Sequence, residues 1–174
     1  MGARREYRGK GEAYRSRQWL LPMPIECVRS ASLTAHLAFE ACRRPGGNKA
    51  LFHELTRVIY LSWFVREAGV GDAPFDDYCL AEGSMNRLAE VAEGTGIWSL
   101  DEDAGAAVIK ILIAYDAQLA TVSSRTFVQA ISQLNHLLSR NGPVSPLDRT
   151  RDTGDTRHCA ASTVGVSPDV VCQN

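Results

Sequence analysis

The segment from residue 49 to residue 69, KALFHELTRVIYLSWFVREAG, constrains the fold more than any other part of the chain. Of the 19 residues from Ala50 to Ala68, 12 are apolar. Two sets of residues recur at helical spacing, one step apart around the helix: Leu51, Leu55, Val58, Ser62 and Val65, and Phe52, Ile59 and Trp63. Because this face is wider than a surface helix needs, it predicts a central helix with neighbours on most sides. Asn48 can cap its start, and Gly69 fits the position after its end.

Four more segments show the helical period. The first spans residues 30–43, is capped by Ser30 or Ser32, and ends before Pro45-Gly46-Gly47. Its apolar face is predicted to hold Leu33, Leu37, Phe39 and Cys42 or Ala41. The loop after it is short, so this helix and the central one should pack antiparallel.

The other three helices follow Gly69. The next is predicted to be capped by Asp72 and to end at Thr95-Gly96, and its apolar positions are Tyr78, Ala81, Met85, Leu88 and Ala92. Another should begin at a capping box made by Ser99 and Glu102. Its apolar positions are Ala104, Val108, Ile111, Leu112, Tyr115 and Leu119, widened by Ile109 and Ile113. The last spans about 124–139, is capped by Ser123 or Ser124, and presents Phe127, Ile131, Leu134 and Leu138.

These patterns predict an all-α protein, a compact bundle of about five helices with disordered N- and C-terminal tails. The periodic residues divide the chain into a basic arm at 1–23, a helical domain at 24–147 and a tail at 148–174. Residues 1–18 are rich in Arg, Gly and Ser and poor in apolar side chains, and residues 140–174 hold several Pro and Gly residues with many Thr, Ser and Asp. Both compositions predict disorder. Met23 is a candidate start of the native chain.

Charge is distributed unevenly along the chain. Residues 1–23 hold six basic and two acidic side chains, a net charge of +4, whereas residues 24–139 hold nine basic and fourteen acidic ones, a net charge of −5. An acidic folded region is a poor surface for a polyanion. The basic arm could contact nucleic acid through Arg4, Arg5, Arg8 and Lys10.

Cysteine spacing and hydropathy bear on the compartment. The five cysteines form no CxxC pair and show no zinc spacing with the four histidines, so reduced thiols in a cytoplasmic protein are expected. No signal peptide is apparent, and charged side chains interrupt the central helix, so we expect no membrane partner. The sequence predicts no metal site and no cofactor.

One constellation in the central helix is a candidate site. His53-Glu54-x-x-Arg57 resembles a zinc-protease helix, but Arg57 stands where the second histidine is required. Glu54 and Arg57 are three residues apart and can form an ion pair on an apolar helix. We therefore expect Glu54 and Arg57 to form a fold-specifying pair or a small polar pocket. His53, Glu54 and Arg57 are together the candidate interaction or polar-pocket residues.

The remaining polar clusters have structural explanations. The acidic runs at 72–77 and 101–103 fall at predicted helix N-termini, where carboxylates are favoured by capping and by the helix dipole. Ser99, Ser123 and Ser124 are explained as caps, and Cys79 as a small buried apolar residue. No candidate nucleophile has a base at a suitable spacing, so we expect no enzymatic activity.

Residues 24–147 carry the tracts LFHELTRVIYLSWFVREAG, TGIWSLDEDA, YDAQLAT and PVSPL. In these tracts the chain resembles small proteobacterial helical proteins that are often labelled Fis family transcriptional regulators. The resemblance implies DNA binding. A Fis-like protein, however, ends in a helix-turn-helix with a basic recognition helix, whereas the last predicted helix here offers only Arg125 and the boundary residue Arg140.

Three functional hypotheses follow. The leading one is a cytoplasmic helical protein with a regulatory role, which acts by contact with a protein partner or by self-association. The alternative is a DNA-binding transcriptional regulator that uses the basic arm. The third, an enzyme, lacks a candidate site.

Overall fold

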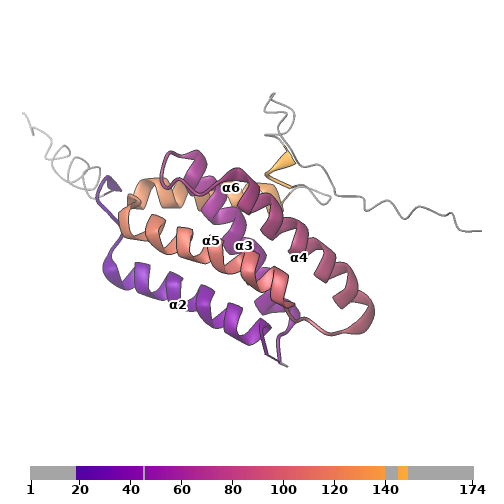
Figure 1. Cartoon of the computed structure of the whole chain (residues 1–174). Helices are drawn as coiled ribbons and strands as arrows, with labels where there is room; N and C mark the ends of the chain where they lie inside the picture. The colour runs from indigo at the N-terminus through magenta and orange to yellow at the C-terminus, as the bar shows by residue number, and fades with distance from the viewer. Residues whose placement is uncertain (1–18, 45, 140–144, 149–174) are drawn as a thin grey trace, which may run out of the picture.

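The computed structural model describes residues 19–44, 46–139 and 145–148, and within them the protein is an all-α bundle (Figure 1). Its helices are α2 (Ile25–Cys42), α3 (Lys49–Glu67), α4 (Phe75–Thr95), α5 (Glu102–Thr121) and α6 (Ser124–Leu138). The predicted class, a compact bundle of about five helices, is confirmed. Most of residues 1–23 and 148–174, which we expected to be tails, lie outside the described part of the chain.

Helix α3 is the centre of the bundle and packs against α2, α4, α5 and α6. Both predicted apolar rows are in place: all their members are buried except Leu51, which is half-buried. The Asn48 side chain accepts a hydrogen bond from the backbone N–H of Leu51 at 3.0 Å, as an N-cap does. After the helix ends, Gly69 has a φ of 86°, a conformation that glycine adopts without a steric penalty. The prediction of a central helix with these ends is confirmed.

The prediction for α2 was right that Phe39 and Cys42 are buried, but it was wrong about the start of the helix and about Leu33 and Leu37. The helix begins at Ile25 rather than at residue 30, after Pro24, so neither Ser30 nor Ser32 caps it. Its buried residues are Ala35, Ala38, Phe39 and Cys42, whereas Leu33 and Leu37 are about 60% exposed. Two alanines in the contact stripe let α2 approach its neighbours closely, and this leaves the bulkier leucines outside. Apolar spacing alone could not distinguish two faces that both carry large residues.

Two further helix starts differ from the predictions. Helix α4 begins after Pro74 rather than after Asp72, and proline is well suited to that position because its φ is already fixed. Helix α5 is capped by Asp101, whose carboxylate accepts from the N–H of Ala104 at 2.8 Å, and not by Ser99. An aspartate, like a serine, can cap a helix by accepting a hydrogen bond from a backbone N–H of the first turn, and Asp101 lies two residues closer to the apolar segment than Ser99 does. The predicted apolar positions of both helices are otherwise buried or half-buried, except Ile113.

Helix α5 is a core helix. It is the one helix of the described chain that is long and apolar enough to cross a membrane, with a mean hydropathy of 1.3, and half of that window is buried inside the bundle. It packs against α2, α3 and α4, and His36 Nε2 lies 2.8 Å from Asp116 Oδ2 across the α2–α5 contact. Helix α6 is capped by Ser123, as predicted, but buries Leu134 and Leu137 and leaves Leu138 exposed.

A buried polar network joins α3, α4 and α5. Ser62 Oγ donates to Gln118 Oε1 at 2.8 Å and lies 2.9 Å from the Tyr78 hydroxyl. Gln118 Nε2 donates to two backbone oxygens, that of Ser62 at 3.0 Å and that of Val70 at 2.9 Å. Since each of these polar groups has a partner, the network can lie in the core without a large desolvation cost. It fixes the loop after α3 against α5.

Candidate functional site

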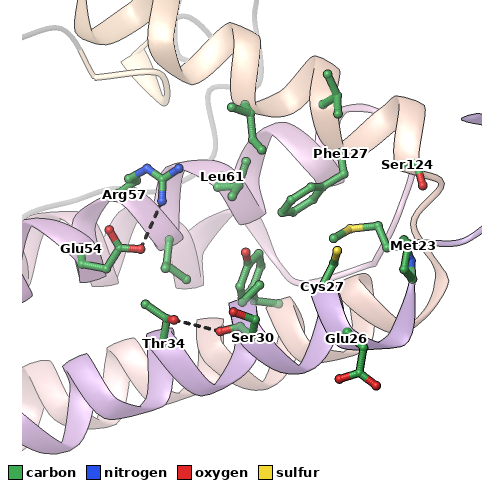
Figure 2. A pocket seen from close by; sticks show the side chains of 16 residues that line it. Met23, Glu26, Cys27, Ser30, Thr34, Glu54, Arg57, Leu61, Ser124 and Phe127 are labelled. Atoms are coloured by element: carbon green, nitrogen blue, oxygen red, sulfur yellow. Dashed lines mark hydrogen bonds and ion pairs between the residues drawn. The ribbon is translucent and has the colours of Figure 1, made fainter.

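A groove of about 580 Å³ runs between α2 and α6 (Figure 2). Helices α2 and α6 both pack against α3 but not against each other within the described residues, and this leaves the space open. Val58 and Leu61 of α3 and Tyr115 of α5 form the floor. The walls are Cys27, Ser30, Ala31 and Thr34 of α2 and Ser124, Phe127, Val128 and Ile131 of α6. We call this space the α2–α6 groove.

The wall residues explain the shape of the groove. On α2 they recur at intervals of three and four residues, and on α6 they do the same, so each wall is one face of a helix. The α2 wall from Pro24 to Thr34 extends roughly 15 Å at 1.5 Å per residue. The groove therefore runs alongside its two walls for two to three helical turns.

Backbone pairing joins the two walls of the groove at one end. Pro22 and Ser123 form an isolated antiparallel bridge. The N–H of Met23 donates to the carbonyl oxygen of Val122 at 3.2 Å, beside this bridge. This contact joins the start of α2 to the start of α6, so the two walls are held at a fixed separation where they begin.

An ion pair lies at the other end. Arg57 Nη1 is 3.1 Å from Glu54 Oε1, and Figure 2 shows both side chains at the edge of the groove. The Glu54 side chain is 28% exposed and that of Arg57 is 40% exposed, so solvent screens the pair and its contribution to stability is small. The pair gives this end of the groove its polarity.

The interior of the groove is mostly apolar, with a few hydroxyl and sulfur groups. Figure 2 shows the side chains of Met23 and Cys27 turned inward and that of Glu26 turned away. Thr34 Oγ1 is already engaged, because it donates to the carbonyl oxygen of Ser30 at 2.8 Å. Burial raises the pKa of Tyr115 well above its ordinary value, so its hydroxyl stays neutral at physiological pH.

The three residues that the sequence singled out, His53, Glu54 and Arg57, all line one hollow of the structure. Glu54 and Arg57 line both the α2–α6 groove and a second hollow of about 360 Å³, and thus separate the two. His53 lines only the second hollow, where its ring meets that of Trp98 edge to face with centroids 5.8 Å apart. His53 is exposed and does not line the α2–α6 groove. The arm residues Arg4, Arg5, Arg8 and Lys10 lie outside the described part of the chain.

Sequence reasoning did not identify the walls of the groove. Phe127 and Ile131 were expected in the core, but they are half-buried and face the open space. Cys27 lies in the first turn of α2, whereas the apolar spacing predicted a helix only from residue 30. The available signal was the strong segregation of apolar from polar residues in α6, which provides more apolar surface than its contact with α3 covers.

The acidic clusters have structural roles in the described region. Asp76 and Asp77 lie in the first turn of α4, and Asp77 Oδ1 is 3.4 Å from Lys110 Nζ. Asp101 caps α5 and is also 3.0 Å from Arg87 Nη2. No group of three potential metal ligands gathers among the residues searched, which are those the structure describes.

The cysteines that the structure describes differ in environment. Cys27 and Cys42 are free thiols, the first exposed and the second fully buried. Burial raises the pKa of Cys42, which makes this thiol unreactive. Cys79, expected to be buried, is half-buried on α4, and the two cysteines beyond residue 148 are outside the described region.

No family model, curated protein or solved structure matches this chain.

Proposed function

We propose that this chain is a non-catalytic regulatory protein of the cytoplasm, which binds a helix of a protein partner in the α2–α6 groove. The observation that carries the proposal is the groove itself, an apolar space of about 580 Å³ on the central helix, between two helices that do not contact each other. Grooves of this kind bind the apolar face of an amphipathic helix in known modes of peptide recognition.

The dimensions support a helix as occupant. The walls are themselves helices, and helices pack at interaxial distances of 8–10 Å when side chains interdigitate. A length of roughly 15 Å along α2 matches about ten residues of a bound helix. Such a helix would place three or four apolar side chains, at i, i+3 or i+4, and i+7, against Leu61, Phe127 and Ile131.

The charges in the groove favour an apolar segment over a charged metabolite. Arg57 is already paired with Glu54, and Glu26 with Arg29 at 3.5 Å. A charged metabolite would have to compete with these pairs, since no other charged side chain lines the groove. Covering the apolar floor with an apolar side chain, by contrast, is favourable because it removes apolar surface from water.

Cys27 provides a chemical probe for the test. A maleimide–benzophenone would be attached to Cys27 in a full-length variant with Cys79→Ala, Cys159→Ser and Cys172→Ser, while the buried Cys42 stays unlabelled. Photolysis in a bacterial lysate would crosslink the occupant, and the crosslinked peptide would be sequenced and synthesised. Its affinity for the unlabelled protein would then be measured by fluorescence anisotropy.

A groove-filling substitution makes the test specific. Ala31→Trp places a bulky side chain in the α2 wall and should weaken peptide binding at least tenfold, whereas Ala117→Trp on the exposed side of α5 should not. Helical peptides with an i, i+3 or i+4, i+7 apolar pattern would support the proposal. Equal affinity of both variants, or the recovery of only a small molecule in native mass spectrometry, would contradict it.

A further inference from the structure

Helix α2 carries an apolar surface that no other part of the described chain covers. Among the described helices it packs against α3 and α5, and in Figure 1 it lies at the lower edge of the bundle. Ala35 and Ala38 are 1% exposed, whereas Leu33 and Leu37, on the opposite side of the same helix, are about 60% exposed. Because removing two leucine side chains from water is favourable, the outer side of α2 is a candidate interaction surface.

The two leucines are the centre of a longer stripe. Six exposed residues recur along α2 and the turn that follows it, at alternating intervals of four and three residues. This is the spacing with which one helix presents a narrow seam to another helix. We call the six residues the outer stripe: Glu26, Ser30, Leu33, Leu37, Glu40 and Arg44.

The outer stripe is complementary to itself when a second copy of the chain runs in the opposite direction. A two-fold axis at the level of Ala35 brings each residue of α2 opposite the residue that lies equally far on the other side of Ala35. Leu33 then faces Leu37 of the second copy, and Glu26 faces Arg44 of the second copy. The same pairing covers the apolar side chains and opposes unlike charges.

The charged groups at the two ends of the stripe are able to take part. In the folded chain Arg29 lies 3.5 Å from Glu26, and Arg43 lies 3.3 Å from Glu40. These side chains are between 48% and 80% exposed, so the pairs are weak and can rearrange around a second copy. Each end of an antiparallel pair would gather two acidic and three basic side chains: Glu26, Arg29, Glu40, Arg43 and Arg44. A parallel pair would instead oppose Glu26 to Glu26 and Arg44 to Arg44.

We propose that the outer stripe is the interface of a symmetric dimer in which the α2 helices of two copies pack antiparallel. A two-fold interface uses the same surface on both subunits, so it requires a surface that is complementary to itself. With one helix from each copy the interface is small, and the dimer therefore forms at high protein concentration and dissociates on dilution. The inference is independent of the partner that the α2–α6 groove binds.

The symmetry of the stripe favours a second copy over an unrelated partner. An apolar segment of any protein could cover Leu33 and Leu37. The charges, however, lie at matched positions, because Glu26 is seven residues before Leu33 and Arg44 is seven residues after Leu37. Opposite charges at equal distances from an apolar centre are what the same helix needs when it pairs with its own reversed copy.

Sedimentation equilibrium of the full-length protein measures the dimer directly. The measurement covers concentrations from about 1 to about 200 µM, because an interface of this size is weak. We expect the average mass to rise from that of a monomer towards that of a dimer. Leu33→Gln with Leu37→Gln should weaken dimerisation at least about tenfold, and glutamine keeps a helix propensity close to that of leucine. The matched control, Leu80→Gln with Val91→Gln on exposed positions of α4, should leave dimerisation unchanged.

Exchange of the end charges tests the antiparallel pairing. Glu26→Arg alone opposes two basic side chains, and Arg44→Glu alone opposes two acidic ones, so each variant should dimerise at least about fivefold more weakly. In an equimolar mixture, each substituted side chain of one variant faces an opposite charge of the other variant. The mixture should therefore dimerise about as tightly as the unsubstituted protein. Circular dichroism checks that each variant folds.

Three results would overturn the proposal. A monomer at every concentration would show that the outer stripe does not bind a second copy. A dimer that persists in the variant with Leu33→Gln and Leu37→Gln would assign the interface to another surface. A mixture of the two charge variants that associates no more tightly than either variant alone would exclude the antiparallel pairing.

Discussion

Replacing Gln118 with Leu should destabilise the protein by about 3 kcal/mol. Gln118 is 1% exposed and makes three hydrogen bonds, two as a donor to the backbone oxygens of Ser62 and Val70 and one as an acceptor from Ser62 Oγ. Each such bond contributes about 1 kcal/mol net. Leucine has a similar size, so it fills the space and leaves the loss of hydrogen bonding as the main effect.

Urea denaturation of the full-length chain would measure this loss as a lower midpoint at an unchanged slope. In a protein of this size, about 3 kcal/mol corresponds to a melting temperature that is roughly 6–12 °C lower. Ser62→Ala and the double variant complete a cycle, and coupling of at least about 0.5 kcal/mol is expected between two residues in contact. A lower urea midpoint, a lower melting temperature and this coupling energy would together show that the polar network stabilises the bundle.

A cost below about 1 kcal/mol for Gln118→Leu, with additive single effects, would refute the reasoning. It would mean that the carbonyl oxygen of Val70 accepts a hydrogen bond from water when the Gln118 amide is removed. Other contacts would then hold the loop after α3. Gly71 provides a second check, because a Cβ at that position would lie 2.9 Å from Cγ of Gln118 and its φ is 92°. Gly71→Ala should therefore also be destabilising.

The remaining predictions concern the core, backbone contacts, pH and DNA. Ile59→Ala should cost roughly 2–5 kcal/mol in urea denaturation, because Ile59 is 1% exposed, and a cost under about 1 kcal/mol would show that the core collapses around the gap. Gly47→Ala should lower the free energy of unfolding by about 1–3 kcal/mol, because the new Cβ would lie 2.1 Å from the carbonyl oxygen of Trp98. The control Gly83→Ala should be neutral or stabilising, because a Cβ there has no neighbouring atom within 4 Å. Burial raises the pKa of Tyr115 in the folded protein, so as pH rises the Tyr115 hydroxyl loses its proton first in the unfolded state. The free energy of unfolding should therefore fall as pH rises above about 10. This fall should be shallower in Tyr115→Phe. A chain that lacks its first 23 residues should show no specific binding to duplex DNA by fluorescence anisotropy at physiological salt, because residues 24–139 carry a net charge of −5. If this chain selected one duplex over random ones, the Fis-like hypothesis would be favoured.

Parts of the candidate site were accessible from the sequence and parts were not. The i, i+3 spacing placed Glu54 and Arg57 on one helix turn, and the ion pair is present at 3.1 Å. His53 lines the second hollow together with them, and its ring meets that of Trp98, a residue 45 positions later in the chain. Only the packing of α3 against the loop before α5 decides which way that ring turns.

The polar network shows a similar division. Gln118 interrupts an otherwise apolar face of α5 and Ser62 an apolar face of α3, and each position is visible in the sequence. Nothing local indicates that these two polar residues meet across 56 positions. Their pairing follows from the way in which α3 and α5 cross in the core.

The sequence by itself determined the helices and the centre of the bundle. Periodicity, the cap at Asn48 and the break at Gly69 depend on chemistry within a few residues, so the pattern of neighbours along the chain suffices to predict α3. The tertiary structure decided which face of α2 is buried, because two alanines allow a closer approach than Leu33 and Leu37 do. It also decided that α2 and α6 flank α3 without touching each other. The groove exists for that reason, since an open space between helices depends on their separation, and no local pattern encodes a separation.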